Sequence, residues 1–137
     1  MSTLTKLGDD FLCVPKLAAD GENWVTYKVR LQWSIDARGL LSHLDGTEKK
    51  PVDPSMLTGR GASWVPSMPD EMKEIVVYNS ANKEWRMGEA VVKQQIASTI
   101  PDTLFIQIKG LATAKEIFMY LANMFEQRSR IVSVELL

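Results

Sequence analysis

The sequence predicts an all-α fold, a compact bundle of about five helices built by a single domain over residues 1–137. Apolar residues recur at spacings of three and four along most of the chain, as in helices that bury one side. No segment shows an apolar–polar alternation that would favour a strand over these helices. Hydrophobic residues make up 45% of the chain, enough for a core of its own.

The N-terminal residues 1–22 are predicted to form an irregular strap over the core, because Pro15 and the turn Asp20-Gly21 argue against a long helix. The first main helix is predicted to begin at Asn23, whose side-chain oxygen can accept a free backbone N–H. Its apolar side carries Trp24, Tyr27, Leu31 and Ile35.

A long connector is predicted between the first and second main helices, over residues 45–69. Four of the six prolines and three of the eight glycines fall in this window. Loops of this length inside a compact domain are usually functional or mobile.

The second main helix is predicted over residues 70–100 and ends before Pro101, because proline disfavours helix in the residue before it. Ser67 is a candidate cap at its start. The segment forms either one helix or two shorter ones divided at Asn79-Ser80. Its apolar stripe is interrupted by two polar residues, Asn82 and Glu89, and consists of Ile75, Tyr78, Trp85, Val92 and Ile96.

The C-terminal part is predicted to contain a short helix after Pro101 and a longer one that begins with a capping box. Thr113 and Glu116 are three residues apart, so each side chain can accept a backbone N–H near the other. Residues 129–137 are expected to start a further, truncated helix. The predicted core signature of the whole chain is Trp24, Tyr27, Leu31, Trp85, Ile96, Phe118 and Leu121.

Composition gives no support for catalysis. The formal net charge is −1, unlike that of a dedicated nucleic-acid-binding protein. Cys13 and His43 are the only residues of their kinds, so no metal site of several cysteines or histidines is expected. His43 is predicted to donate to a backbone carbonyl at a helix end. We therefore expect no enzyme activity, no cofactor and no small-molecule substrate.

Two sets of residues are candidates for contacts with partners. The apolar end of the chain is a candidate assembly interface, formed by Ile131, Val134, Leu136 and Leu137. Four basic residues are candidate weak RNA contacts, although surface salt bridges explain them better: Lys49, Lys50, Arg128 and Arg130. No apolar run reaches the ~20 residues of a membrane span, so we expect a cytoplasmic protein with no membrane partner.

Several motifs follow one another along residues 17–137: Asn23-Trp24-x-x-Tyr27-Lys28, Leu31, Gly39-Leu40, His43-Leu44-Asp45-Gly46, Trp85 with Ala90 and Ile96, Ile100-Pro101-Asp102-x-Leu104, Thr113-Ala114-Lys115-Glu116-Ile117-Phe118, and Leu121, Phe125 and Ser129. In this order they resemble the amino-terminal, capsid-like region of the gag polyprotein of copia-type LTR retrotransposons. The resemblance implies a helical structural domain that associates with itself into particle-like shells.

The chain departs from that family in two ways. Tyr27 and Phe118 stand where the family tends to have tryptophan, and a core tolerates this exchange. The family commonly continues into further helices and a Cys/His zinc knuckle, which one cysteine cannot form, so specific RNA packaging is not implied. The chain is then a fragment, a truncated copy or a domesticated gene.

We therefore expect a non-catalytic, self-assembling capsid-type domain whose main partner is itself. One alternative is a decayed or domesticated gag remnant that acts as a helical protein-binding module. Another is a weak RNA-binding module.

Overall fold

The computed structural model describes residues 14–57 and 59–136, with side chains described as far as Gln127. This part of the chain is all-α, as predicted, and contains no strand. Its elements are α2 (Trp24–Ala37), α3 (Leu41–Asp45), the 3-10 turn η1 (Pro54–Met56), α4 (Pro69–Ala97), α5 (Asp102–Ile108) and α6 (Ala114–Leu136).

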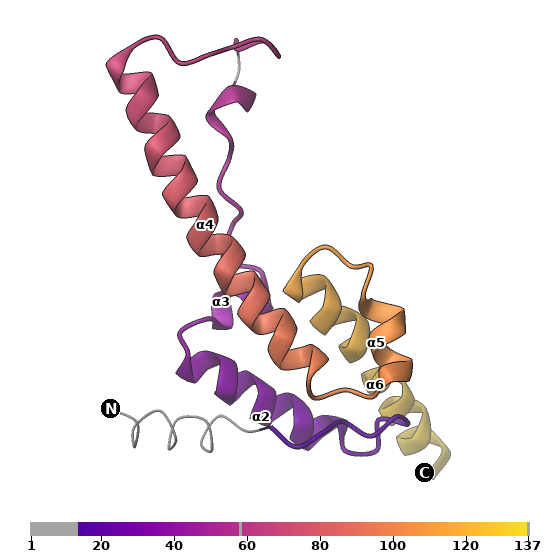
Figure 1. The fold of residues 1–137 in the computed structure, drawn as a ribbon. Helices are drawn as coiled ribbons and strands as arrows, with labels where there is room; N and C mark the ends of the chain where they lie inside the picture. Colours follow the sequence, from indigo (N-terminus) through magenta and orange to yellow (C-terminus); the bar gives the residue numbers. More distant parts are fainter. Residues whose placement is uncertain (1–13, 58, 137) are drawn as a thin grey trace, which may run out of the picture.

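The helices form a body from which an arm projects (Figure 1). The body contains α2, α3, α5, α6 and the C-terminal half of α4. The short helix α3 contacts α2, α4 and α6. The buried apolar side chains come from all five helices and from the segments that flank them: Val14, Leu17, Trp24, Tyr27, Leu31, Ile35, Leu44, Val92, Ile96, Ile100, Leu104, Ile108, Ala114, Ile117, Phe118, Leu121, Ala122 and Phe125.

Aromatic rings fill the space between α2 and α6. The ring centroid of Trp24 lies 6.0 Å from that of Phe118 and 5.7 Å from that of Phe125. Phe125 also packs on Gly21, where an added Cβ would lie 1.9 Å from the ring and where φ is +75°. Glycine is therefore required at this turn on two grounds, its backbone conformation and the close approach of the ring.

Asn23 precedes α2 as predicted, but its side chain makes no capping bond to the helix. Its Oδ1 accepts from the N–H of Ala18 at 2.8 Å, and its Nδ2 donates to the carbonyl of Lys16 at 3.0 Å. Asn23 thus holds the irregular segment before α2 in place. The backbone N–H of Leu17 donates to the backbone carbonyl of Thr99, which follows the end of α4. Residues 1–13 of the expected strap lie outside the described part of the chain.

Helix α4 is one continuous helix of 29 residues, so Asn79-Ser80 does not divide it. These two residues cost an exposed helix only a few tenths of a kcal/mol each. Its C-terminal half buries Gly88, Glu89, Val92 and Ile96 in the body. Between residues 69 and 83 no residue of α4 is buried, and this half forms the arm together with the connector.

The connector leaves α3 at Gly46, runs beside the first half of α4 and turns back into it (Figure 1). It contains η1, which contacts α4. Asp53 caps η1, because its carboxylate accepts from the backbone N–H of Ser55 at 2.9 Å. We call residues 51–83 the arm.

Helix α6 begins where the capping box predicted. The hydroxyl of Thr113 accepts from the N–H of Glu116 at 3.2 Å. Glu116 in turn accepts from the N–H of Ala112 at 2.9 Å, one residue earlier than expected. The expected new helix at residue 129 is wrong, because α6 continues without a break to Leu136. No proline or glycine occurs after Gly110 to end it. In the described part of the chain no helix is both long enough and apolar enough to cross a membrane.

Candidate protein-interaction surface

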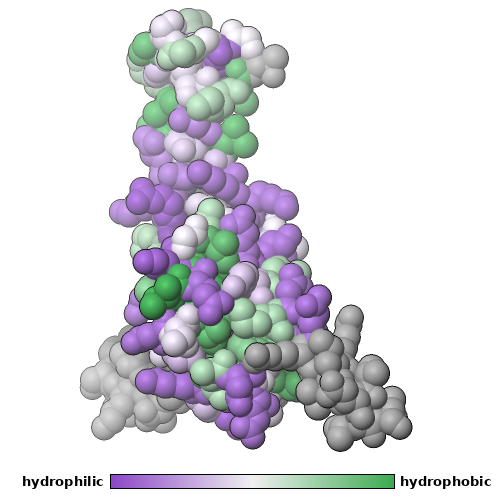
Figure 2. All heavy atoms as spheres, turned by 90° about the vertical axis from the view of Figure 1, so that its right-hand side faces the viewer, coloured by the Kyte–Doolittle hydropathy of each residue, from purple (hydrophilic) through white to green (hydrophobic). Residues whose placement is uncertain are grey.

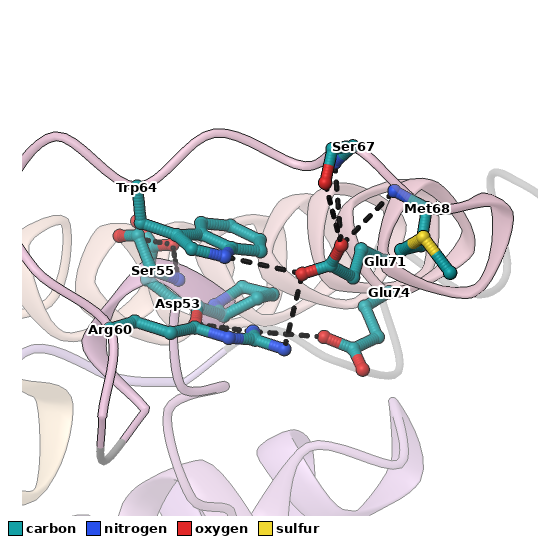
Figure 3. A network of polar contacts seen from close by, with 9 residues as sticks. Asp53, Ser55, Arg60, Trp64, Ser67, Met68, Glu71 and Glu74 are labelled. Carbon is teal, nitrogen blue, oxygen red and sulfur yellow. Dashed lines mark hydrogen bonds and ion pairs between the residues drawn. The ribbon is translucent and has the colours of Figure 1, made fainter.

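The connector is fastened to α4 by the guanidinium of Arg60, which is 19% exposed. Its Nη1 donates to the carbonyl of Pro54 at 2.8 Å and to the carboxylate of Glu74 at 3.0 Å. The guanidinium carbon also lies 4.2 Å from the centroid of the Trp64 ring, a cation–π contact. Arg60 therefore joins two parts of the connector to the first turns of α4 (Figure 3).

Glu71 also holds the connector against α4, and we call Arg60 and Glu71 together the clamp. It accepts from the indole N–H of Trp64 at 3.2 Å and from the backbone N–H groups of Met68 at 3.0 Å and Ser67 at 3.3 Å. These bonds, above all that from Met68, hold the pKa of the Glu71 carboxyl below its usual range. Met68, not the predicted Ser67, occupies the N-cap position. The carboxylate of Glu71 supplies the acceptor at the positive end of the helix.

Next to the clamp, the connector and α4 line an apolar groove of about 480 Å³. This volume lies within the ~300–1,000 Å³ typical of ligand pockets. The groove is lined by Pro51, Val52, Pro54, Leu57, Asp70, Lys73, Glu74, Val77, Tyr78 and Ala81. Charged groups therefore stand among a mostly apolar lining.

A second apolar surface lies on the side of α4 that faces away from the groove and the body. Met72, Val76 and Met87 are 53%, 67% and 59% exposed. They share one face of α4 with two exposed polar residues, since spacings of three and four return to the same side of a helix. We call this set the outward stripe: Met72, Val76, Asn79, Lys83 and Met87. Figure 2 views the arm from the side of the connector, and there hydrophobic residues are visible among polar ones at the top of the view.

His43 on α3 and Glu89 on α4 form a buried pair of ionisable side chains in the body. The Nδ1 of His43 lies 2.8 Å from one carboxylate oxygen of Glu89. The other oxygen accepts from the N–H of Ala114 at 3.1 Å, at the start of α6. A Cβ at Gly88 would lie 2.3 Å from the imidazole, so glycine is needed there. His43 thus bonds to a carboxylate, in contrast to the predicted backbone carbonyl, and the pair joins three helices.

Both side chains of this pair are enclosed by protein. Both residues are about 5% exposed and are enclosed by helix α3, helix α4 and the start of α6. In the described part of the chain, no group of three or more His, Cys, Asp or Glu residues could hold a metal ion. The geometry assigns the pair a structural role.

The candidate RNA contacts are divided between the connector and α6. Lys49 donates to the carbonyl of Gly46 at 3.2 Å, and the ammonium of Lys50 lies 5.8 Å from the ring centroid of Trp85. The side chains of Arg128 and Arg130 lie outside the described part. Of the four candidates, Lys49 and Lys50 have described side chains, and both contact groups of their own chain.

The candidate assembly interface is beyond what the structure describes in detail. The backbones of Ile131, Val134 and Leu136 belong to α6, but their side chains are not described, and Leu137 lies outside the described residues. Self-association through this segment stays a prediction.

Six residues of the predicted core signature are buried: Trp24, Tyr27, Leu31, Ile96, Phe118 and Leu121. The seventh, Trp85, is only partly buried and is not part of the core cluster, in contrast to the prediction. It lies where α4 leaves the body, between the His43 ring, at a centroid distance of 6.4 Å, and Lys50. Periodicity placed it on the correct side of α4, but the body ends near this point.

Sequence reasoning missed the arm and its clamp. The sequence does indicate the outward stripe, because Met72, Val76 and Met87 lie on a side of the predicted helix that the core stripe does not use. Glu89 also gave a signal, since a charged residue in the phase of a buried stripe requires a buried partner. Arg60 gave none, because its partners are set by the path of an irregular connector.

Comparisons of the chain with protein-family models, with curated proteins and with solved structures found no match.

Proposed function

We propose that this protein is a non-catalytic structural subunit that associates with itself, the role implied by its resemblance to copia-type gag. The observation that carries the proposal is the arm, which projects from the body and exposes apolar side chains the core does not use. On the connector, Val52, Met56 and Val65 are 66%, 77% and 71% exposed. Contiguous exposed apolar surface is typical of protein–protein contact sites.

The clamp supports this proposal. Arg60 and Glu71 hold an otherwise irregular connector against α4 by several bonds at once. An interaction surface that is already ordered loses less conformational entropy when a partner binds. A subunit that repeats the same contact benefits from such order.

The charge balance also supports self-association. A net charge of −1 produces little repulsion between copies. The two described basic candidates, Lys49 and Lys50, both contact groups of their own chain, which makes them weaker evidence for an RNA-binding role.

Light scattering after size exclusion, on the full chain across protein concentration and salt, tests the proposal. We expect the mass to rise with concentration and to persist at high salt, because apolar contacts are not screened. The matched form without residues 131–137 tests whether the predicted interface at the chain end contributes. A mass of one chain at every concentration would contradict the proposal, and salt-sensitive binding to RNA would favour the RNA-binding alternative.

The groove favours a second candidate, a protein-binding module that takes an apolar peptide. Selection of peptides from a random library against the chain tests this role. We expect the selected peptides to lose binding when Val77→Arg fills the groove, and to keep it with Val25→Arg, an equally exposed valine on α2. Equal loss in both variants, or in neither, would remove the groove from consideration.

A further inference from the structure

We propose that two copies of this chain pair through the outward stripes of their α4 helices, packed antiparallel about a twofold axis at Asn79-Ser80. This inference rests on the self-association proposed above and assigns it a surface. The stripe is available, since all of its residues are exposed and lie away from the body and the groove.

The order of residues along the stripe fits an antiparallel pair. In a twofold pair each residue faces one equally far from the axis on the other side. Met72 and Met87 are equidistant from the point between Asn79 and Ser80, so Met72 packs against the partner's Met87, and the reverse. Val76 faces the stem of the partner's Lys83, which covers it while its ammonium stays in water. Small polar residues at the axis allow close approach of the two helices.

The charges beside the stripe are complementary in this orientation. Lys73 and Glu84 are exposed and lie along the same edge of the stripe. Their distances from the axis differ by two residues, about 3 Å at a rise of ~1.5 Å per residue, which two long side chains can span. An antiparallel pair therefore brings Lys73 beside the partner's Glu84 twice. In a parallel twofold pair the two copies of this edge would lie on opposite sides of the contact, so Lys73 and Glu84 would not face each other. Within the described part of the chain, neither residue is assigned an ion pair of its own.

Like charges on the stripe do not oppose the pairing. Arg86, beside the stripe, is as far from the axis as the partner's Lys73 but lies on the opposite edge of the stripe. The partner's Arg86 lies roughly 20 Å away at a rise of ~1.5 Å per residue. The two Lys83 side chains begin roughly 10 Å apart by the same rise. Both separations reach or exceed the Debye length of ~8 Å at physiological salt.

The apolar area that the two stripes would bury indicates weak association of the two copies. Full burial of a Val or Met side chain removes roughly 60–120 Å² of apolar surface. Met72, Val76 and Met87 are a little over half exposed, so six side chains contribute on the order of 250–450 Å². This is well below the ~1,200–2,000 Å² of stable complexes. We expect association in the high micromolar range, strengthened only when several contacts act together.

Charge reversal tests the pairing by sedimentation equilibrium. In Lys73→Glu and in Glu84→Lys, attraction becomes repulsion at both flanking contacts, so each variant alone should raise the dimer dissociation constant about tenfold. An equimolar mixture of the two variants should restore the wild-type constant, because both flanking contacts of a mixed dimer again join a carboxylate to an ammonium. A mixture that associates as weakly as its components would overturn the antiparallel pair.

Cross-linking locates the axis independently of charge. In a Cys13→Ser background, Ser80→Cys should be joined into dimers by a short bismaleimide reagent, whereas Lys109→Cys, exposed beyond α5, should not. Equal cross-linking at both positions would indicate random collision and overturn the proposal. Unchanged circular dichroism confirms that each variant is folded.

These outcomes separate the two proposals. If the wild-type chain never exceeds the mass of a monomer, both self-association and the stripe pairing fail. Suppose instead that the wild-type chain associates, that the charge variants associate as it does, and that Ser80→Cys is cross-linked no better than Lys109→Cys. Then only the pairing through the stripe is wrong.

Discussion

At the scale of single residues, the most constrained group is the carboxylate of Glu89. It is buried, and its two oxygens bond to the imidazole of His43 and the N–H of Ala114. A buried charge is tolerated only when it is paired and fully hydrogen-bonded. Each oxygen of Glu89 has one such partner, and the carboxylate links α4 to α3 and to the start of α6.

Removing this carboxylate should be costly. Glu89→Ala leaves the imidazole of His43 and the N–H of Ala114 buried without an acceptor, and we expect a loss of roughly 3–5 kcal/mol in the free energy of unfolding. Urea denaturation measures it. Glu84→Ala, an exposed carboxylate on the same helix, is the matched control and should change stability by less than ~0.5 kcal/mol. Equal effects in the two variants would show that the pair does not stabilise the fold.

Tyr27 should make stability fall at high pH. Burial raises the pKa of its phenol from 10.0 to about 12, against the smaller opposing effect of its hydrogen bond with Thr99. The folded state therefore favours the neutral phenol. Its contribution, up to about 3 kcal/mol, is complete below pH 10 and is lost as the pH rises towards 12.

The measurement is the free energy of unfolding across this pH range, with the ultraviolet absorbance of tyrosinate as a direct titration. Tyr27→Phe is the control, since it keeps the ring and removes the ionisable group. A pH dependence of stability that survives unchanged in Tyr27→Phe would mean that another group causes it.

At the scale of elements, periodicity predicted where helices occur but not how much of each is buried. The stripe on α4 has the correct phase along its whole length. Only Val92 and Ile96 of its five residues reach the core, because the body covers just the C-terminal half of the helix. Helix length is a local property, whereas burial depends on the path of distant segments.

The difference between local and distant contacts also explains which features could be predicted from the sequence. The start of α6 was predictable because Thr113 and Glu116 act within one turn. The clamp of Arg60 was not, because it joins residues of an irregular connector to a helix more than ten positions away. Of the candidate site, sequence could therefore indicate its helix and its unused apolar side, but not the connector that walls the groove.

The clamp should control local order in the arm. Arg60→Ala removes the bonds to Pro54 and Glu74 together, and we expect hydrogen exchange in residues 51–57 to accelerate at least about tenfold through local opening. Global stability should change by less than ~1 kcal/mol, because no core side chain is affected. Lys83→Ala, an exposed residue of the arm outside the clamp, is the control. Exchange that is unaltered in Arg60→Ala would show that the groove keeps its shape without the clamp.

At the scale of the whole molecule, the protein combines a body that holds the core with an arm that holds exposed apolar surface (Figure 1). The two parts share the continuous backbone of α4. Burial differs sharply along this helix, from Val92 at 0% exposure to Val76 at 67%. A helix segment without tertiary burial opens at a lower free energy than one inside a core.

This division predicts two levels of stability within α4. Trp24 is 2% exposed in the body, and Trp24→Ala should lower the free energy of unfolding by roughly 3–5 kcal/mol. Native-state hydrogen exchange should then show this loss at the amides of Val92 and Ile96, which exchange through global unfolding. The amide of Val76 should exchange as in the wild type, because it opens locally before the body unfolds. If protection at Val76 falls by the same amount, α4 unfolds as one unit with the body, and the arm gains its order from the core as well as from its clamp.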